Sequence, residues 1–230
     1  MFDLRRFVAE CKACLDTPNP VDRVRALVDC AVAQPRALAA ALPRSDEDET
    51  LVHADERIML VHIQLTPNVH FPPHNHHMPV VVGLFHGVET NIMYLLDSDG
   101  RPRAIERSAV VAPTTYLVPE DGIHSVANHG ETRSAALHVY LGDLVHQART
   151  IWNPATFARH PYSDERYFDL AVPFDLSRPF RRPSTPDVHG SHRSVCGQAC
   201  NSDQVHTKAS RPSRSASSRS KPSTRSRRCF

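Results

Sequence analysis

The 230-residue sequence has few cysteines, no long hydrophobic run and no hydrophobic leader. No apolar stretch approaches the roughly 18 residues that a membrane span requires. The N-terminus, MFDLRRFVAE, lacks the hydrophobic region of a signal peptide. The six cysteines fall three near each end, and none lies in the histidine-rich middle, which argues against a disulfide framework. We therefore expect a soluble cytoplasmic protein.

Charge divides the chain into two parts. Residues 1–175 carry 15 Lys and Arg against 23 Asp and Glu, whereas residues 176–230 carry 12 against 2. The basic segment is rich in Ser, Arg, Pro and His without periodicity, so we predict that it is disordered. Basic arms can bind nucleic acid, but this one has almost no aromatic residues to stack on bases. We expect a solvated tail, and a shifted reading frame is the other explanation for its abrupt start.

The first 45 residues have the periodicity of helices. Pro20 stands in the first turn of one of them, with Asn19 as its expected cap. Cys11 and Cys14 share an apolar helix face and have no matching second pair in the body, so we expect core cysteines and not a zinc or redox half-site. The predicted helices cover residues 2–15, 20–33 and 36–42.

The composition changes after an acidic segment, 45–49, which we expect to be a solvated link. Short runs rich in Val, Ile and Tyr then alternate with turn-forming clusters such as "DSDG", "PEDG" and "NHGE". Several short strands at such spacing favour an all-β sandwich or barrel. The predicted strands cover residues 58–65, 80–85, 91–96, 109–111, 116–118 and 135–141.

Histidines cluster beside these strands. His74 and His76 are two residues apart, so on a strand both point to the same face and could meet one metal ion. His124 follows 48 residues later in a turn leading into a strand, and His138 shares a strand face with Tyr140. The alternative is a set of surface or hydrogen-bonded histidines, but the joint spacing favours a metal site.

Two segments resemble the motifs of a known family. "HNHHMPVVVGLFHG" resembles the first cupin motif, and "PEDGIHSVAN" resembles the second with its glycine displaced by one. Within the cupins, "PPHNHHMPVVVGLFHGVETN" and "IHSVANHGETRSAALHVYLGD" are most similar to the cysteine dioxygenase type and to related metal-dependent enzymes. The likeness covers about residues 1–168 and excludes the tail.

The resemblance implies a mainly β fold, the cupin double-stranded β-helix or jelly-roll barrel. The domain plan is then a helical segment over 1–45, the barrel over 46–175 and the disordered tail over 176–230. The resemblance also implies that His74, His76 and His124 are ligands of Fe(II). Tyr140 would hydrogen-bond substrate or bound oxygen, and His138 would orient its hydroxyl.

Most cupins place a glutamate ligand where this sequence has Val80. Three neutral imidazoles leave the dipositive charge of a metal intact, so the ion should favour an anionic bidentate ligand. A thiolate with a second donor group fits this need and leaves a position for dioxygen, which implies oxidation of a small thiol to a sulfinic acid. For cysteine or a 3-mercapto acid, Arg57 or Arg133 would bind the substrate carboxylate.

Other functions stay open at this point. Where the resembled enzymes have a serine in a Ser-x-His-x-Tyr relay, this chain has Ala136, and Val81 replaces a cysteine that some animal members cross-link to the tyrosine. His138 could instead be a core histidine bonded to a backbone carbonyl. The alternatives are a non-catalytic cupin that senses a metal or small molecule, and an isomerase or decarboxylase using nickel, manganese or another metal.

Overall fold

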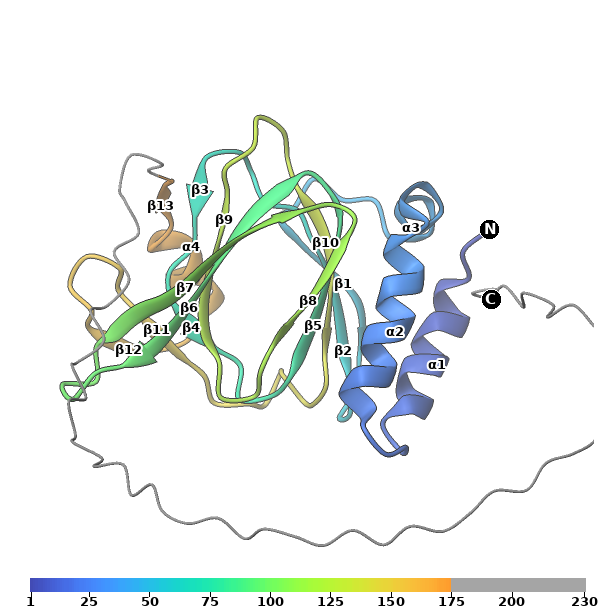
Figure 1. Cartoon of the computed structure of the whole chain (residues 1–230), viewed down its shortest axis with the longest axis horizontal. Coiled ribbons are helices and arrows are strands. Elements are labelled where there is room, and N and C mark those ends of the chain that lie inside the picture. The colour runs from blue at the N-terminus through green and yellow to red at the C-terminus, as the bar shows by residue number, and fades with distance from the viewer. Residues whose placement is uncertain (175–230) are drawn as a thin grey trace, which may run out of the picture. The chain divides into compact units, whose positions relative to one another are not determined.

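The computed structural model describes Met1–Phe174, and this part of the chain is mainly β, as predicted (Figure 1). The basic segment 176–230, predicted to be disordered, lies outside the described residues. The helices are α1 (Leu4–Cys14), α2 (Pro20–Val32), α3 (Pro35–Ala41) and α4 (Asp164–Asp169). The strands are β1 (Glu49–Ala54), β2 (Met59–Ile63), β3 (Val69–His70), β4 (His74–Asn75), β5 (Val80–His86), β6 (Val88–Leu96), β7 (Pro102–Val111), β8 (Thr114–Val118), β9 (Ile123–Asn128), β10 (Ala135–Tyr140), β11 (Thr150–Trp152), β12 (Arg159–Pro161) and β13 (Val172–Pro173).

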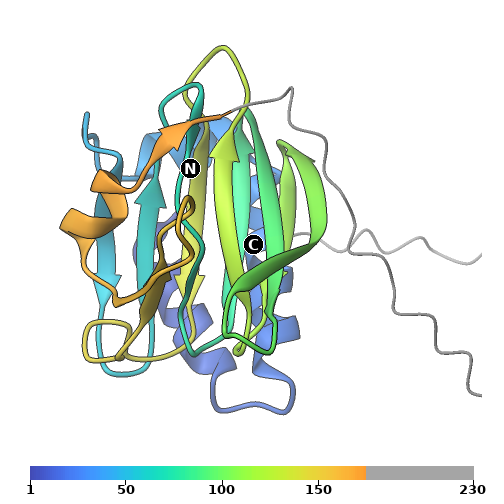
Figure 2. The same ribbon diagram turned by 90° about the vertical axis from the view of Figure 1, so that its left-hand side faces the viewer.

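Two antiparallel sheets face each other. One has the order β1-β2-β10-β5-β8, and the other runs β12-β11-β4-β9-β3-β13, with β6 joining β9 to β7. Strands distant in the sequence are neighbours in both sheets: β10 lies between β2 and β5, and β9 pairs with β3, β4 and β6. Figure 1 shows the two sheets side by side, and Figure 2 looks onto the sheet that contains β9, with the helices behind. This arrangement is the predicted double-stranded β-helix, a fold of cupin type.

The strand β5 explains why its sequence is a continuous apolar run. Val80, Val82 and Leu84 point into the space between the sheets, while Val81 and Phe85 point to the opposite face. All five are buried, because α1, α2 and α3 cover that opposite face (Figure 1). A strand covered on both sides needs apolar residues at every position.

The helical layer approaches the sheet most closely at Gly83. A Cβ atom at this position would lie 2.5 Å from Cγ1 of Val28 and 2.7 Å from Cγ1 of Val32, both on α2. Glycine therefore lets the helix pack directly on the strand. Cys11 of α1 is fully buried in this interface, and burial raises the pKa of its thiol to about 12, which agrees with a core cysteine.

Some local predictions need correction. Asn19 precedes α2, but its backbone is left-handed at φ 58° and its side chain makes no capping hydrogen bond. Glu49 is the first residue of β1, so the acidic segment 45–49 is not wholly a link. The sequence patterns also gave no indication of β11 and β12, each only three residues long. No helix in the described part is long and apolar enough to span a membrane.

Candidate metal centre and cavity

The strand pairing between the two halves of the chain brings three predicted metal ligands together. His74 on β4 lies directly opposite His124 on β9, and His76 follows two residues after His74. The ring centroids are 4.7 Å apart for His74 and His124, 4.8 Å for His74 and His76, and 5.1 Å for His76 and His124. One ring nitrogen from each residue lies within 4.8 Å of the other two.

Burial keeps all three imidazoles neutral. Their exposed fractions are 5% for His74, 3% for His76 and 2% for His124. Desolvation lowers the pKa of His74 to about 4. It also holds the pKa values of His76 and His124 well below the usual value, and repulsion from the charged forms of the neighbouring histidines adds to this effect. Each ring therefore has a lone pair available at neutral pH.

Hydrogen bonds fix which nitrogen carries that lone pair in two of the rings. Nδ1 of His74 donates to the carbonyl of Pro72 at 3.0 Å, and Nδ1 of His124 donates to Oδ1 of Asn91 at 2.8 Å. Each Nε2 is then an acceptor, as in metal-binding histidines whose other nitrogen is held by a carbonyl or amide. Within residues 1–174, Nε2 of His124 and Nδ1 of His76 are buried and have no hydrogen-bond partner. A divalent metal ion would satisfy such orphaned acceptors, so the residues fit one.

No carboxylate joins the cluster. Among residues 1–174, these histidines are the one group of His, Cys, Asp and Glu side chains close enough to hold a metal ion. Val80, at the position where most cupins have glutamate, is fully buried in the apolar core between the sheets. The site therefore offers three neutral nitrogen donors and no negative charge of its own.

The histidines lie in the wall of a cavity of about 260 Å³. Tyr140 and His138 lie in the same wall, side by side on one face of β10, as predicted. The hydroxyl of Tyr140 lies 3.4 Å from Nδ1 of His138, and the Tyr140 ring centroid is 5.3 Å from that of His76. Burial raises the pKa of Tyr140 and lowers that of His138 to about 3, so the phenol and a neutral imidazole form the pair at neutral pH.

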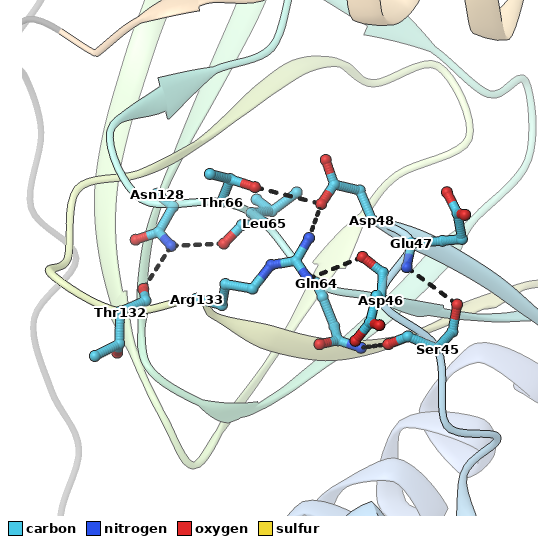
Figure 3. Close-up of polar contacts among 10 residues, drawn as sticks. All are labelled: Ser45, Asp46, Glu47, Asp48, Gln64, Leu65, Thr66, Asn128, Thr132 and Arg133. Atoms are coloured by element: carbon cyan, nitrogen blue, oxygen red, sulfur yellow. Dashed lines mark hydrogen bonds and ion pairs between the residues drawn. The ribbon is translucent and has the colours of Figure 1, made fainter.

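The structure brings neither Arg57 nor Arg133 to the cavity. Arg57 pairs with Asp16 at 2.6 Å on the exposed surface. Arg133 pairs with Asp48 and donates to the carbonyl of Asp46 at 3.0 Å, as Figure 3 shows. Both guanidinium groups thus bind other parts of the protein, and a role in holding a substrate carboxylate stays a prediction.

Arg149 is the arginine that lines the cavity, and the sequence patterns did not point to it. Its guanidinium carbon lies 3.5 Å above the ring of Tyr162. Glu49, Asp164 and Tyr167 also line the cavity. They come from β1 and from α4, both outside the two motif-like segments, so residue spacing gave no signal for them. The complete lining is Glu49, Met59, Val61, Ile63, Leu65, His74, His76, His124, Val126, His138, Tyr140, Leu144, Val145, Arg149, Tyr162, Asp164 and Tyr167.

A buried glutamate lies elsewhere between the sheets. Glu89 on β6 is 1% exposed, and its Oε1 accepts a hydrogen bond from Oγ of Ser134 at 2.6 Å. Among the described residues, Oε2 of Glu89 and the buried hydroxyl of Tyr116 have no hydrogen-bond partner. Desolvation raises the pKa of Glu89 to about 7, the hydrogen bond from Ser134 opposing this. Glu89 is not part of the candidate metal centre.

Comparison with known proteins adds little to this geometry. No protein-family model matches the chain, and no curated protein matches it. Among solved structures, oxalate decarboxylase from Bacillus subtilis matches 38% of this chain and 22% of its own length, at 19% identity and a TM-score of 0.32. A second structure of that enzyme, studied for its Mn(II) centres, matches 50% of this chain and 31% of its own length, at 21% identity and a TM-score of 0.37. The similarity therefore spans less than a third of the oxalate decarboxylase chain.

Two other similar structures are closer in size. A conserved protein with a double-stranded β-helix domain from Klebsiella pneumoniae matches 49% of this chain and 86% of its own, at 10% identity and a TM-score of 0.38. A protein from Bacillus halodurans matches 48% of this chain and 76% of its own length, at 12% identity and a TM-score of 0.40. Likenesses this distant bear on the fold alone and carry no argument about activity. The fold is a double-stranded β-helix, and its three-histidine cluster is a candidate metal centre.

Proposed function

We propose that this protein is a mononuclear metal-dependent thiol dioxygenase, with Fe(II) held by His74, His76 and His124. In the reaction, a small thiol and one molecule of O2 give a sulfinic acid, RSH + O2 → RSO2H, so that both oxygen atoms end on sulfur. The observation that carries the proposal is that three neutral, buried imidazoles converge in the wall of a small cavity and that no carboxylate belongs to this cluster within residues 1–174. The ion would supply a binding site for thiolate and activation of dioxygen.

The protein's own groups support this chemistry in three ways. The carbonyl of Pro72 and the amide of Asn91 orient two of the imidazoles. The Tyr140 hydroxyl, buried beside His138, can donate a hydrogen bond to a ligand in the cavity while its proton stays on oxygen. Apolar residues of the wall, such as Val61 and Leu144, limit the water around a reacting thiolate.

A non-catalytic cupin that binds a metal or a small molecule is the second candidate. The observation in its favour is Ala136, which is fully buried on the same face as His138 and has no hydroxyl to complete a hydrogen-bonded relay. The Tyr140–His138 contact at 3.4 Å is also at the long end for a hydrogen bond. Both features would be tolerated in a protein that binds without turnover.

The test begins with the metal. The purified protein is analysed for Fe, Mn, Ni and Zn, because imidazole accepts all of these ions, and is then loaded with Fe(II) without oxygen. Oxygen consumption is measured on adding single small thiols, and the product is identified by mass spectrometry. Uptake of one O2 per sulfinate formed supports the dioxygenase. Stable binding of a thiol without oxygen uptake across the panel would overturn it in favour of the non-catalytic candidate.

A further inference from the structure

A second pocket adjoins the cavity and lies where β11 and β12 form one edge of the second sheet (Figure 1). It is a groove of about 520 Å³, and Arg149 lines both it and the cavity. Strand alternation separates the two pockets, because His74 and His76 line the cavity while Asn75 between them points to the other side. We call this pocket the basic groove, after its side chains His77, Arg149, Arg159 and His160.

The ionisable side chains of the basic groove are all of one kind. Two arginines and two histidines line it, and no Asp or Glu does. Among residues 1–174, no carboxylate oxygen comes within the 4.0 Å of an ion pair to Arg149 or Arg159. Glu49 and Asp164 belong to the lining of the cavity and not to that of the groove. A groove lined by positive charge raises the local concentration of anions.

The buried side chain of Asn75 determines which ring nitrogen of His77 is free. Oδ1 of Asn75 accepts the backbone N–H of Thr150 at 2.8 Å, so its Nδ2 is the donor to Nε2 of His77 at 3.0 Å. Since Nε2 accepts, the hydrogen of the neutral ring lies on Nδ1. Within the described part of the chain, Nδ1 of His77 has no hydrogen-bond partner. The exposed side chain of His77 therefore has a donor available for a ligand.

The backbone of His77 is also unusual. Its φ is 54°, in the left-handed region that residues other than glycine seldom adopt. Such conformations cost free energy, and they cluster at active sites and where proteins hold ligands. The hydrogen bond from Asn75 keeps the exposed ring of His77 in one position.

Hydrogen bonds connect Arg159 to the same group of residues. Nη2 of Arg159 donates to Oγ1 of Thr150 at 3.3 Å, and the backbone N–H of Thr150 is bonded to Asn75, which holds His77. Arg159 is exposed, and among residues 1–174 its guanidinium makes no other hydrogen bond. One short set of contacts thus positions two side chains that both have donors to spare.

We propose that the basic groove binds the phosphate group of a small molecule, with Arg159 and His77 as hydrogen-bond donors and Arg149 as a nearby positive charge. The planar fork of an arginine matches two phosphate oxygens, and Nδ1 of His77, on a different segment, would donate to a third. A carboxylate has only two oxygens in one plane, so it would use these donors less well. The groove is larger than a phosphate group, which leaves room for the organic part of the ligand. The proposal does not depend on the dioxygenase function.

The test measures phosphate binding by the full-length protein. Inorganic phosphate and acetate are titrated calorimetrically at low ionic strength, where salt screens charge least. We expect saturable binding of phosphate, at least about 10-fold tighter than that of acetate. Arg159→Gln should weaken phosphate binding by at least about 10-fold, because charged hydrogen bonds are lost. His77→Asn places a residue that tolerates the left-handed backbone and should weaken binding by about 3- to 10-fold.

Two controls distinguish this groove from other anion sites. Arg5→Gln removes the same charge from an exposed position on α1, which packs on the other sheet, and should bind phosphate like the native protein. His124→Ala removes a ligand of the candidate metal centre and should also keep its affinity for phosphate. This second control tests whether the phosphate binds to a metal ion instead of the groove.

The outcomes decide the proposal without any measurement of oxygen chemistry. Absence of saturable phosphate binding, or an equal loss of affinity in Arg159→Gln and Arg5→Gln, overturns it. Acetate bound as tightly as phosphate would indicate a carboxylate site and also overturns it. Phosphate binding that is lost in His124→Ala but kept in Arg159→Gln would assign the anion to the metal ion. Loss confined to the Arg159 and His77 variants supports the phosphate site, whether the dioxygenase proposal holds or fails.

Discussion

The side-chain oxygen of Asn91 accepts a hydrogen bond from Nδ1 of His124 at 2.8 Å, and both residues are buried. Asn91 lies on β6, the neighbour of the strand that carries His124, so the sheet itself sets this distance. The bond leaves Nε2 of His124 as the acceptor, in a ring whose centroid lies 4.7 Å from that of His74 and 5.1 Å from that of His76. Asn91 is thus a positioning residue for the candidate metal centre.

Replacing Asn91 tests this relationship. Asn91→Ala should weaken metal binding by about 10- to 100-fold, because the ring loses the bond that fixes its orientation and tautomer. The measurement is competition with a chromophoric chelator. Asn91→Asp offers an oxygen acceptor at the same place and should recover most of the affinity. Equal affinity of Asn91→Ala and the native protein would mean that packing alone orients His124.

Removing one of the three histidines should have a larger effect. We expect His124→Ala to abolish stoichiometric iron binding, because two imidazoles without a carboxylate are too few ligands for a mononuclear site. Metal content after anaerobic loading and desalting gives the result. His86→Ala, an exposed histidine at the end of β5, is the control and should bind one ion like the native protein. Iron retained or activity preserved without His124 would contradict the assignment.

Tyr140 should affect turnover without affecting the metal. Tyr140→Phe keeps the ring beside His76 and removes the hydroxyl that lies 3.4 Å from His138. We expect an unchanged iron content and a turnover lowered by about 10- to 100-fold. Metal analysis and oxygen uptake on the same sample separate the two quantities. An unchanged rate would leave the Tyr140 hydroxyl without a part in the reaction.

Glu89 makes stability depend on pH. Its pKa rises from 4.5 to about 7 on folding, so its contribution to stability is fully present below pH 4.5 and is lost as pH rises through about 7. Gln cannot ionise and can still accept the hydrogen bond from Ser134. The free energy of unfolding of Glu89→Gln should therefore equal that of the native protein at pH 4.5 and be larger at pH 8. A shift of this size corresponds to about 3 kcal/mol. Urea unfolding at both pH values measures it, and the same difference at both would show that Glu89 does not ionise in this range.

Gly83 should be required for the helical layer to dock. Gly83→Ala places a methyl group within 2.7 Å of Val28 and Val32, which should lower the free energy of unfolding by about 1–3 kcal/mol. Thermal and urea unfolding measure the loss. Val28→Ala removes one of the clashing groups, so the double variant should lose less than the sum of the two single variants. Strict additivity would mean that the helix moves away without strain.

Local patterns in the sequence predicted the helices and strands whose residues show a regular apolar spacing. Helix periodicity located α1, α2 and α3 within two residues at each end, and apolar runs located β2 and β5. The short strands β11 and β12 and the left-handed Asn19 were missed, because contacts with distant segments and not local preference determine them. His74, for example, pairs across β4 with Ile151 of β11, far along the chain.

The sequence by itself predicted the three histidines of the candidate metal centre: the spacing of His74 and His76 implies a shared strand face, and the resemblance to the second cupin motif added His124. Only the tertiary structure decided what surrounds that set. Arg57 and Arg133 bind carboxylates on the surface, whereas Glu49, Arg149 and Asp164 reach the cavity from segments about 100 residues apart in sequence. The physical reason is that alternation along a strand is a local rule, whereas the charge of a cavity depends on which distant segments the sheets bring together.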